Sequence, residues 1–319
     1  MSQPSSPETA APAPRRLGAS QVFPVGLGTM PLSFERVLDD RDRALATVHA
    51  ALDAGVTHLD TARIYAPSWD TVGHNEALVA EALASWSGDA SAVVVASKGG
   101  IVRGPDGDSR DGSRDGLRRV CEASLVSLGR DVVDVYYLHR ADPSLPFAEQ
   151  VENLLALREA GLAREVALSN VSPQMLEVAL DVAGGPDDGG VVAVQNEFSP
   201  RFREHASVIE TCAARGIAFV PWSPFGGADR AGEVGSRYQV FTDVAEAHGA
   251  TAHQVALAWL LALSPTVVPI PGSSRPETVA GSAAAAGLVL SEDEVRRLSA
   301  SAPEGTSQYP DDQPEPALR

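Results

Sequence analysis

Short apolar runs alternate with longer segments of helical periodicity along this 319-residue chain. Such alternation is typical of βα units that build a parallel sheet. The predicted strands are Val25–Gly28, Thr57–Asp60, Ala92–Ser97, Val133–Leu138, Arg164–Leu168, Val191–Gln195, Ala218–Trp222 and Thr266–Ile270. Eight parallel strands in a chain of this length favour a closed (α/β)8 TIM barrel over an open doubly wound sheet.

Local signals support the helices between these strands. Leu45, Val48 and Leu52 recur at helical spacing after Asp39-Asp40, and Gly55 follows as a stop. Ser172 precedes Pro173, which is the order of an N-cap and a first helical residue. A capping-box pattern begins at Ser291 near the end of the chain. These signals predict helices over the stretches that link the strands.

We interpret the chain as one barrel domain over residues 15–319, with a short N-terminal hairpin or tail and a C-terminal helix and tail. Residues 1–14 are rich in Ser, Pro and Ala and lack an apolar core, so a disordered tail is expected rather than a signal peptide. Gly- and Pro-rich insertions over 104–116, 184–190 and 225–235 are expected to be lids or binding loops.

The net charge of −17 disfavours nucleic acid and anionic membranes as partners. No apolar run approaches the roughly 20 residues of a membrane span. Cys121 and Cys212 are expected as buried reduced thiols, and no metal-type cysteine spacing occurs. We therefore expect a cytoplasmic protein without a metal, a monomer or weak homo-oligomer. The Ala-, Gly- and Asp-rich composition points to a bacterial source.

Polar side chains follow three neighbouring predicted strands, where a parallel barrel carries its chemistry: Asp60 and Tyr65, then Lys98, then His139. A tyrosine hydroxyl titrates at about pH 10. An ammonium lowers that pKa, and a carboxylate keeps the ammonium charged. A histidine adds a hydrogen bond to a substrate oxygen. Singly, the four residues could be an N-cap, a half-buried aromatic, a solvated cation and a core histidine. Together they favour a general acid aimed at a carbonyl oxygen.

Ordered motifs extend this interpretation. They are Gly26-Leu27-Gly28-Thr29-Met30, Leu59-Asp60-Thr61-Ala62 with Tyr65, Ala96-Ser97-Lys98, Tyr136-Tyr137-Leu138-His139, Gly161 through Leu168-Ser169-Asn170, Gln195, Trp222-Ser223-Pro224 and Ile270-Pro271-Gly272. In this order, over residues 15–300, the chain resembles the aldo-keto reductase superfamily. The resemblance implies an NADPH-dependent reductase of aldehydes or ketones, with NADH as a possible coenzyme. It makes Asp60, Tyr65, Lys98 and His139 the catalytic tetrad, in which Tyr65 protonates the carbonyl oxygen.

The resemblance also assigns residues to the coenzyme. Ser169, Asn170 and Gln195 match the group that holds the nicotinamide carboxamide, and Trp222 matches the aromatic residue stacked on its ring. Arg275 could hold a 2′-phosphate, which favours NADPH. The further implied contacts are Gly28, Thr29, Met30, Asp60, Ser223, Pro224, Phe225, Gly226, Gly272, Ser273, Ser274, Thr278 and Ser282. Read alone, Ser169-Asn170 is an ordinary cap, Trp222 a core residue and Arg275 a solvated charge.

The chain departs from the family pattern at two places. Ala66 stands where a glycine usually follows the tyrosine. Thr278, Gly281 and Ser282 stand where the family usually has a Gln or Arg and then a Glu-Asn pair. The second departure implies weaker coenzyme binding or a softer preference for NADPH.

The substrate pocket is less constrained. Its candidate residues follow strand ends or lie in adjacent loops: Met30, Trp69, Arg140, Phe198 and Phe225. Arg140 could meet a negative substrate group or pair with Asp142. The tail over 302–319 is expected to help shape the pocket. A sugar-nucleotide ketone, pyridoxal and other carbonyl compounds all stay open as substrates.

Two alternatives to a reductase stay open. One is a non-catalytic NADP(H)-binding regulatory subunit on the same fold. The other is a barrel aldolase in which Lys98 forms a Schiff base, although that leaves Trp222, Gln195 and the stretch 272–275 without a role.

Overall fold

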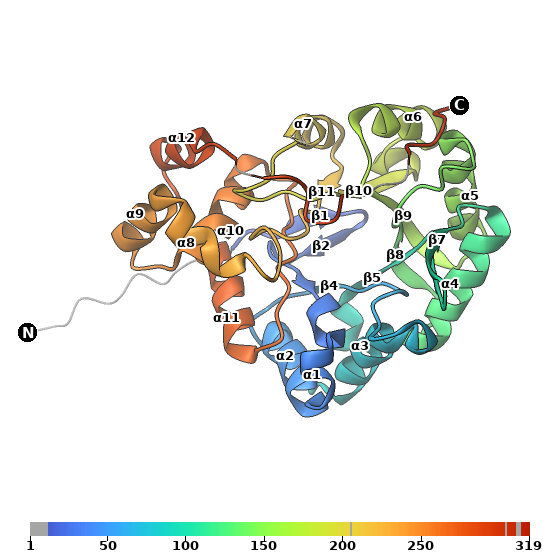
Figure 1. The fold of residues 1–319 in the computed structure, drawn as a ribbon, viewed down its shortest axis with the longest axis horizontal. Coiled ribbons are helices and arrows are strands. Elements are labelled where there is room, and N and C mark those ends of the chain that lie inside the picture. Colours follow the sequence, from blue (N-terminus) through green and yellow to red (C-terminus); the bar gives the residue numbers. More distant parts are fainter. Residues whose placement is uncertain (1–11, 205, 304, 311–313) are drawn as a thin grey trace, which may run out of the picture.

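Parallel strands form one curved sheet at the centre of the molecule, and helices surround it (Figure 1). The computed structural model describes residues 12–204, 206–303, 305–310 and 314–319, so most of the expected tail over 1–14 lies outside the described residues. In spatial order the strands are β11 (Ala218–Phe219), β10 (Val191–Gln195), β9 (Ala163–Ser169), β8 (Val133–Leu138), β5 (Val94–Gly99), β4 (His58–Asp60) and β3 (Leu27–Gly28). Each overlaps a predicted strand: β8 and β10 have the predicted bounds, and β3, β4 and β11 are shorter than predicted. β5 begins and ends two residues later, and β9 extends one residue further at each end.

The eighth predicted strand, over 266–270, closes the barrel without forming a regular strand. On one side, the backbone N–H of Val268 donates to the carbonyl of Phe219 in β11 at 2.8 Å. On the other, the carbonyl of Pro269 accepts from the N–H of Gly26, just before β3, at 2.9 Å. Proline has no N–H to return to β3, so this ladder is incomplete. The prediction of a regular strand is wrong here, and the expected closure of the barrel is achieved by irregular pairing.

Helices cover the outside of the barrel. The α-helices of the described residues are α1 (Glu35–Leu38), α2 (Arg41–Asp53), α3 (His74–Ser85), α4 (Arg114–Leu128), α5 (Phe147–Glu159), α6 (Pro173–Ala183), α7 (Ala206–Arg215), α8 (Val234–Arg237), α9 (Gln239–His248), α10 (Ala252–Leu263), α11 (Pro276–Ala284) and α12 (Glu292–Ala300). The 3₁₀ helices are η1 (Met30–Ser33), η2 (Trp69–Thr71), η3 (Ala90–Ala92), η4 (Pro186–Asp188), η5 (Ala231–Glu233) and η6 (Ala285–Gly287). The predicted caps are confirmed: Ser172 Oγ accepts from Met175 N, and Ser291 forms a capping box with Glu294.

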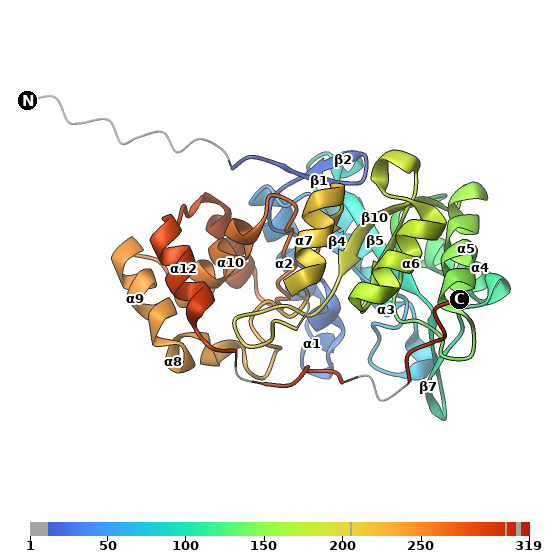
Figure 2. The same cartoon turned by 90° about the horizontal axis from the view of Figure 1, so that it is seen from above.

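Two hairpins lie at opposite ends of the barrel. The hairpin of β1 (Arg15–Leu17) and β2 (Ser20–Val22) covers one end, as Figure 2 shows. Its Leu17 and Val22 pack onto the apolar interior of the barrel. The hairpin of β6 (Ile101–Gly104) and β7 (Gly107–Arg110) lies at the other end, which the chain after α12 also crosses (Figure 2). The carboxyl ends of the parallel strands point to this second end, where a barrel of this kind carries its site.

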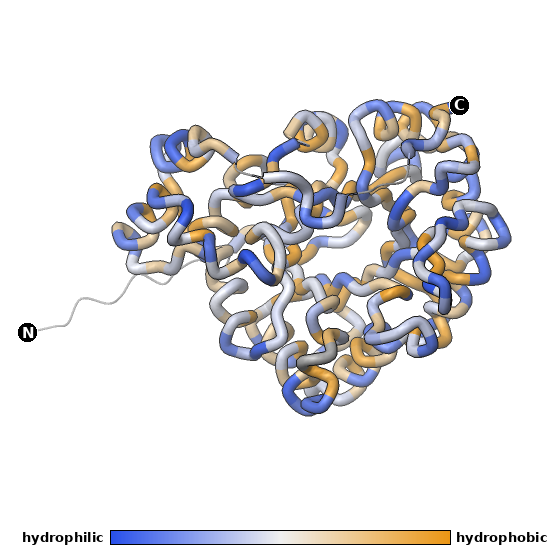
Figure 3. The backbone as a smooth tube through the Cα atoms, viewed as in Figure 1, coloured by the Kyte–Doolittle hydropathy of each residue, from blue (hydrophilic) through white to orange (hydrophobic). Residues whose placement is uncertain are grey.

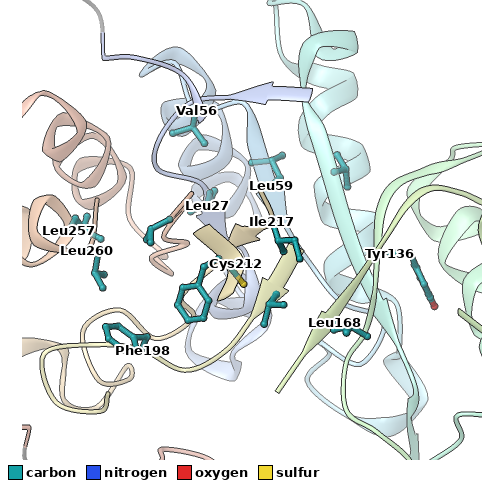
Figure 4. Close-up of a cluster of buried hydrophobic side chains, with 14 of the residues drawn as sticks. Leu27, Val56, Leu59, Tyr136, Leu168, Phe198, Cys212, Ile217, Leu257 and Leu260 are labelled. Carbon is teal, nitrogen blue, oxygen red and sulfur yellow. The ribbon is translucent and has the colours of Figure 1, made fainter. Parts of the chain in front are cut away.

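A second apolar layer lies between the sheet and the helices. Figure 3 shows apolar segments on the inner strands and polar ones on the outer turns of the helices. Leu27, Leu59 and Leu168 from the strands meet Leu257 and Leu260 of α10 in one continuous cluster (Figure 4). Both cysteines are buried and free, as predicted, and burial raises the pKa of each thiol to about 12. These thiols are therefore packing groups.

Candidate active site

A cavity of about 540 Å³ opens at the carboxyl ends of the strands. Its walls include the following residues predicted for the site: Gly28, Met30, Asp60, Tyr65, His139, Arg140, Ser169, Asn170, Gln195, Trp222, Ser223, Pro224, Phe225 and Gly272. Gly28 ends β3, Asp60 ends β4, Ser169 ends β9 and Gln195 ends β10. Parallel strands bring these carboxyl ends to one rim. Residues spread over more than 240 positions of sequence thereby line one cavity.

A buried ion pair lies at the base of this cavity. Lys98 Nζ donates to Asp60 Oδ1 at 2.5 Å and to the backbone carbonyl of Thr61 at 2.9 Å. It also donates to Tyr65 OH at 3.2 Å. Lys98 belongs to β5. Tyr65 lies in the turn after β4, and its backbone N–H donates to Ala62 O at 3.0 Å. The strand fixes the ammonium and the turn brings the phenol to it.

Burial and charge oppose each other in this group. Burial alone would lower the pKa of Lys98, but Asp60 and Tyr65 outweigh it, and the pKa is raised. Burial raises the pKa of Tyr65 more than the nearby ammonium of Lys98 lowers it, so the net pKa is above its ordinary value. Lys98 itself lowers the pKa of Tyr65, as expected, but burial outweighs this effect and the net shift is upward. Tyr65 is a protonated phenol at neutral pH, held against a charged ammonium.

His139 forms the adjoining wall of the cavity. Its ring centroid lies 5.8 Å from that of Tyr65, with the rings edge to face. Its backbone N–H donates to Gly99 O at 2.7 Å, which fixes the residue beside β5. Burial, followed by Lys98 and three arginines, lowers the pKa of His139 well below its usual value. The imidazole is therefore neutral at pH 7 and able to donate or accept one hydrogen bond in the cavity.

Polar side chains at the next strands form a connected network. Asn170 Nδ2 donates to Ser169 Oγ and to His139 O, both at 3.0 Å, and Trp222 Nε1 donates to Asn170 Oδ1 at 3.1 Å. Gln195 Nε2 donates to Asp60 Oδ2 at 2.7 Å. Asn170 has a left-handed φ of 57°, a conformation uncommon outside glycine and enriched at functional sites. The network links the residues predicted for the coenzyme to the buried ion pair.

The chain after α12 reaches the opposite wall. Ser223, which has φ 48°, donates from Oγ to Gln308 Oε1 at 2.6 Å. The ring of Tyr309 lies 5.9 Å from that of Trp222. Ser307 Oγ donates to Glu197 Oε2 at 2.6 Å. The C-terminal tail thus lines the cavity beside Trp222, in the region where the sequence analysis expected it.

Two predicted substrate residues lie away from the cavity. Phe198 is buried in the outer core, stacked on Trp259 of α10 with ring centroids 6.0 Å apart (Figure 4). Its assignment to the pocket is wrong, because the chain after β10 turns this ring outward toward α10. Trp69 lies on η2 and is 52% exposed, outside the cavity walls. Met30, Arg140 and Phe225 do line the cavity.

The remaining predicted coenzyme residues do not line the cavity. Thr29 is buried, and its hydroxyl lies within hydrogen-bonding distance of two acceptors, Asp60 O and Asn75 Oδ1. Gly226 belongs to the loop after Ser223, with φ 82°. Ser273, Ser274, Arg275, Thr278 and Ser282 follow Gly272 into α11. Arg275 precedes Pro276 at the start of this helix, with its side chain 64% exposed.

Sequence reasoning missed several residues of the site. Asn75, at the start of α3, uses both ends of its side-chain amide: Oδ1 accepts from the hydroxyls of Thr29 and Thr61, and Nδ2 donates to Ser33 Oγ at 2.8 Å. This binds the loop after β3 to the end of β4. Its only local signal is an amide close to a helix start. Arg103, Asp108 and Arg110 also line the cavity from the β6–β7 hairpin.

Comparison with known proteins decides the family. The family model described as "Aldo/keto reductase family" matches residues 24–302. The chain belongs to this family. Pyridoxine 4-dehydrogenase of Escherichia coli K12 is 33% identical over 292 residues, covering 88% of this chain and 96% of that protein. An uncharacterized oxidoreductase of Schizosaccharomyces pombe is 31% identical, covering 89% and 88%.

Solved structures agree with the aldo-keto reductase fold. An aldo/keto reductase from Klebsiella pneumoniae, crystallised with NADP and acetate, superposes with a TM-score of 0.77 at 26% identity, covering 93% of this chain and 98% of that one. The (α/β)8 barrel is therefore the fold of this aldo-keto reductase, and oxidoreductase chemistry is the family's activity. Within the described ranges, no helix of this family member has both the length and the apolar character of a bilayer span.

Proposed function

We propose that this protein uses NADPH to reduce an aldehyde or ketone to the alcohol, with Tyr65 as the general acid. The proposal is carried by the 3.2 Å contact of Lys98 Nζ with Tyr65 OH, in a cavity that His139 also lines. It is supported by the NADP in the Klebsiella neighbour and by the dehydrogenase name of the Escherichia coli relative.

The wall made by Ser169, Asn170 and Trp222 fits the nicotinamide end of the coenzyme. Ser169 Oγ and Asn170 Oδ1 each accept one hydrogen bond within the network, and each has a second lone pair. These two acceptors match the two N–H groups of a carboxamide. The indole of Trp222 offers an apolar face to the ring. When bound, NADPH supplies the hydride that reaches the carbonyl carbon.

The tetrad handles the proton. The substrate oxygen lies between Tyr65 OH and the neutral imidazole of His139, and both groups hydrogen-bond it. Tyr65 transfers its proton to this oxygen as negative charge develops there. The Lys98 ammonium then stabilises the phenolate, and Asp60 keeps that ammonium charged and oriented. A raised pKa keeps Tyr65 protonated before the transfer.

The rest of the coenzyme is assigned to the neighbouring loops. In the loop 223–227, the small residues Ser223, Gly226 and Gly227 would let backbone N–H groups approach the pyrophosphate. Gly28 cannot carry a side chain, because a Cβ there would lie 2.8 Å from Ile270 O. Gly272 and the following residues through Arg275 lead to the start of α11, where Arg275 would hold the 2′-phosphate. Thr278 and Ser282 would face the adenosine half, each with one hydroxyl in place of the larger polar groups usual in the family.

A carbonyl panel tests this function. Purified protein is assayed with NADPH and with NADH against aldehydes and ketones that include pyridoxal. We expect NADPH-dependent turnover that Tyr65→Phe lowers by about 10²- to 10⁴-fold, with little change in coenzyme affinity. The matched control is Tyr238→Phe, because Tyr238 is buried beside Phe241 in the outer core.

Other outcomes support the alternatives. Tight NADPH binding without turnover of any carbonyl compound would favour a non-catalytic coenzyme-binding subunit. Borohydride trapping of a substrate on Lys98 would favour an aldolase. Substantial activity in Tyr65→Phe would show that another group supplies the proton.

A further inference from the structure

A second buried carboxylate lies on the outer side of the sheet, behind the pair of Asp60 and Lys98. Glu76 is the third residue of α3, and its side chain is fully buried. Its Oε1 accepts from Ser97 Oγ at 2.5 Å, and its Oε2 accepts from Arg63 Nη1 at 3.3 Å. One carboxylate therefore joins strand β5 to the turn after β4.

The two partners of Glu76 adjoin the ammonium and the phenol of the tetrad. Ser97 directly precedes Lys98 in β5, and successive residues of a strand point to opposite faces. Lys98 therefore faces the interior of the barrel, whereas Ser97 faces α3. Arg63 lies two positions before Tyr65 in the turn. Glu76 thus links the two backbone segments that carry Lys98 Nζ and Tyr65 OH, which lie 3.2 Å apart.

Arg63 is held between α3 and α4. Its Nη1 lies 2.6 Å from Ser127 Oγ of α4, and its side chain is 21% exposed. Gly73, directly before α3, leaves room for the guanidinium, because a Cβ there would lie 2.2 Å from Nη1. The φ of 98° at this residue also favours glycine. The Arg63 side chain therefore occupies space that any larger residue at position 73 would fill.

The start of α3 also pairs with the backbone of the turn. Gly73 N donates to Arg63 O at 2.9 Å, and Asn75 N donates to Tyr65 O at 3.2 Å. The first N–H groups of a helix have no acceptor within the helix, and here the turn supplies the acceptors. Backbone and side-chain contacts thus bind the turn of Tyr65 to the same helix that carries Glu76.

We infer that Glu76 is a positioning residue for the general acid Tyr65. Its carboxylate bridges Ser97 and Arg63, and this bridge sets the distance between the ammonium and the phenol hydroxyl. A displacement of about 1 Å at a reacting group can slow a reaction about 100-fold, so a small movement of the turn is enough to matter. The inference rests on the proposed reductase function and adds a residue that acts on the same site from behind.

Three substitutions of Glu76 separate its reach from its charge. Glu76→Gln keeps the reach, since its amide oxygen can accept from Arg63 while its N–H donates to Ser97 Oγ. Glu76→Asp keeps the charge but is one methylene shorter, and Glu76→Ala removes the bridge.

The three variants are assayed with NADPH and an aldehyde that the unaltered protein reduces. We expect kcat to fall at least about tenfold in Glu76→Ala and Glu76→Asp, and less than about threefold in Glu76→Gln. KM and NADPH affinity should change less than about twofold, because the bridge lies outside the cavity. An active Glu76→Asp beside an inactive Glu76→Gln would overturn the positioning role.

Leu78→Ala is the matched control for lost stability. Leu78 is buried in the apolar layer and belongs to the same helix α3. Its truncation removes packing and leaves the bridging groups in place, so the urea midpoint should fall while kcat stays within about twofold. If Leu78→Ala lowers kcat as much as Glu76→Ala does, at a similar loss of urea midpoint, Glu76 only supports the fold.

A double variant tests whether Glu76 acts through Tyr65. In Tyr65→Phe there is no hydroxyl left to position, so adding Glu76→Ala should lower kcat less than about threefold further. A further loss as large as in the protein that retains Tyr65 would show that Glu76 acts independently of Tyr65, and this would overturn the inference.

Amide hydrogen exchange separates this inference from the proposed function, because it needs no turnover. Exchange over 61–66 should speed up at least about tenfold in Glu76→Ala and change less than about threefold in Leu78→Ala. Faster exchange supports the bridge even if no carbonyl compound is reduced, and unchanged exchange overturns the inference. Full activity of Glu76→Ala leaves the reductase function standing and removes the positioning role.

Discussion

Lys98 Nζ lies 2.5 Å from Asp60 Oδ1, and both side chains are almost completely buried. Removing two charges from water is costly, and their mutual attraction offsets this only with good geometry and further hydrogen bonds. Here Thr61 O and Tyr65 OH accept from the ammonium, and Gln195 Nε2 donates to the carboxylate. The pair is thus a fully partnered group whose members depend on each other.

Asp60→Ala should therefore destabilise the fold strongly. The substitution leaves the Lys98 ammonium buried without its counter-ion, which costs about 3–5 kcal/mol in the free energy of unfolding. Urea denaturation followed by circular dichroism measures the loss. Glu122→Ala is the control, because its pair with Arg118 is exposed and contributes at most about 1 kcal/mol. Equal losses of unfolding free energy in the two variants would show that the Lys98 ammonium does not depend on Asp60 for its stability.

Two buried imidazoles should make the fold sensitive to mild acid. Burial is the main cause that lowers the pKa of His58 and of His139. As the pH falls through about 6.5, the unfolded chain takes up protons that the folded chain excludes, so stability falls. Glu76 and Glu197 act in the opposite direction, since burial raises the pKa of each.

Because these groups act in opposite directions, the effect of the two imidazoles is measured by comparing the unaltered protein with a variant that lacks both. Urea midpoints at pH 8 and pH 5.5 should fall less in His58→Gln/His139→Gln than in the unaltered protein. An identical shift in both would show that these imidazoles do not cause the acid sensitivity.

The sequence predicted that polar residues at several strand ends meet at one rim, because the signals for strand ends are local. Asp60 ends a predicted strand, and Lys98 and His139 each directly follow one. It failed where contacts join distant segments. Phe198 follows β10 as closely as many pocket residues do, yet it stacks on Trp259, which lies 61 positions away. Periodicity describes which face of an element is apolar, and cannot show which way a loop turns after it.

The sequence predicted that the tail over 302–319 helps to shape the pocket, but not which of its residues do so. The reason is again that the contacts join segments distant in sequence. Tyr309 reaches Trp222 because both ends of the tail are held by contacts remote in sequence. Near its end, Ala317 O accepts from Phe147 N at 2.7 Å, at the start of α5. This carbonyl satisfies an N–H that the helix itself leaves unpaired. Neither segment alone carries a pattern that predicts the contact.

Glu197 should hold the tail at the cavity. Its buried carboxylate accepts from Ser307 Oγ at 2.6 Å and from Gln308 N at 3.0 Å. Glu197→Ala removes both acceptors, so amide hydrogen exchange over 305–310 should speed up at least tenfold and KM for the carbonyl substrate should rise. Asp181→Ala is the control, since its exposed pair with Arg319 lies at the far end of the tail. Unchanged amide exchange over 305–310 in Glu197→Ala would show that other contacts hold the tail at the cavity.

Arg275 should determine the choice between the two coenzymes. It stands at the start of α11, exposed, with its Nε 3.9 Å from Glu277 Oε1. This loose surface pair leaves the guanidinium able to turn to a 2′-phosphate, which NADPH carries and NADH lacks. A hydrogen bond to a charged group contributes about 1.5–3 kcal/mol, so Arg275→Ala should weaken NADPH binding about 10- to 150-fold. Fluorescence titration with each coenzyme measures this, and NADH affinity should change less than twofold.

Arg296→Ala is the matched control, because Arg296 is equally exposed and pairs with Asp293 on α12. A similar loss of affinity for both coenzymes would mean that Arg275 contacts a part of the coenzyme common to the two.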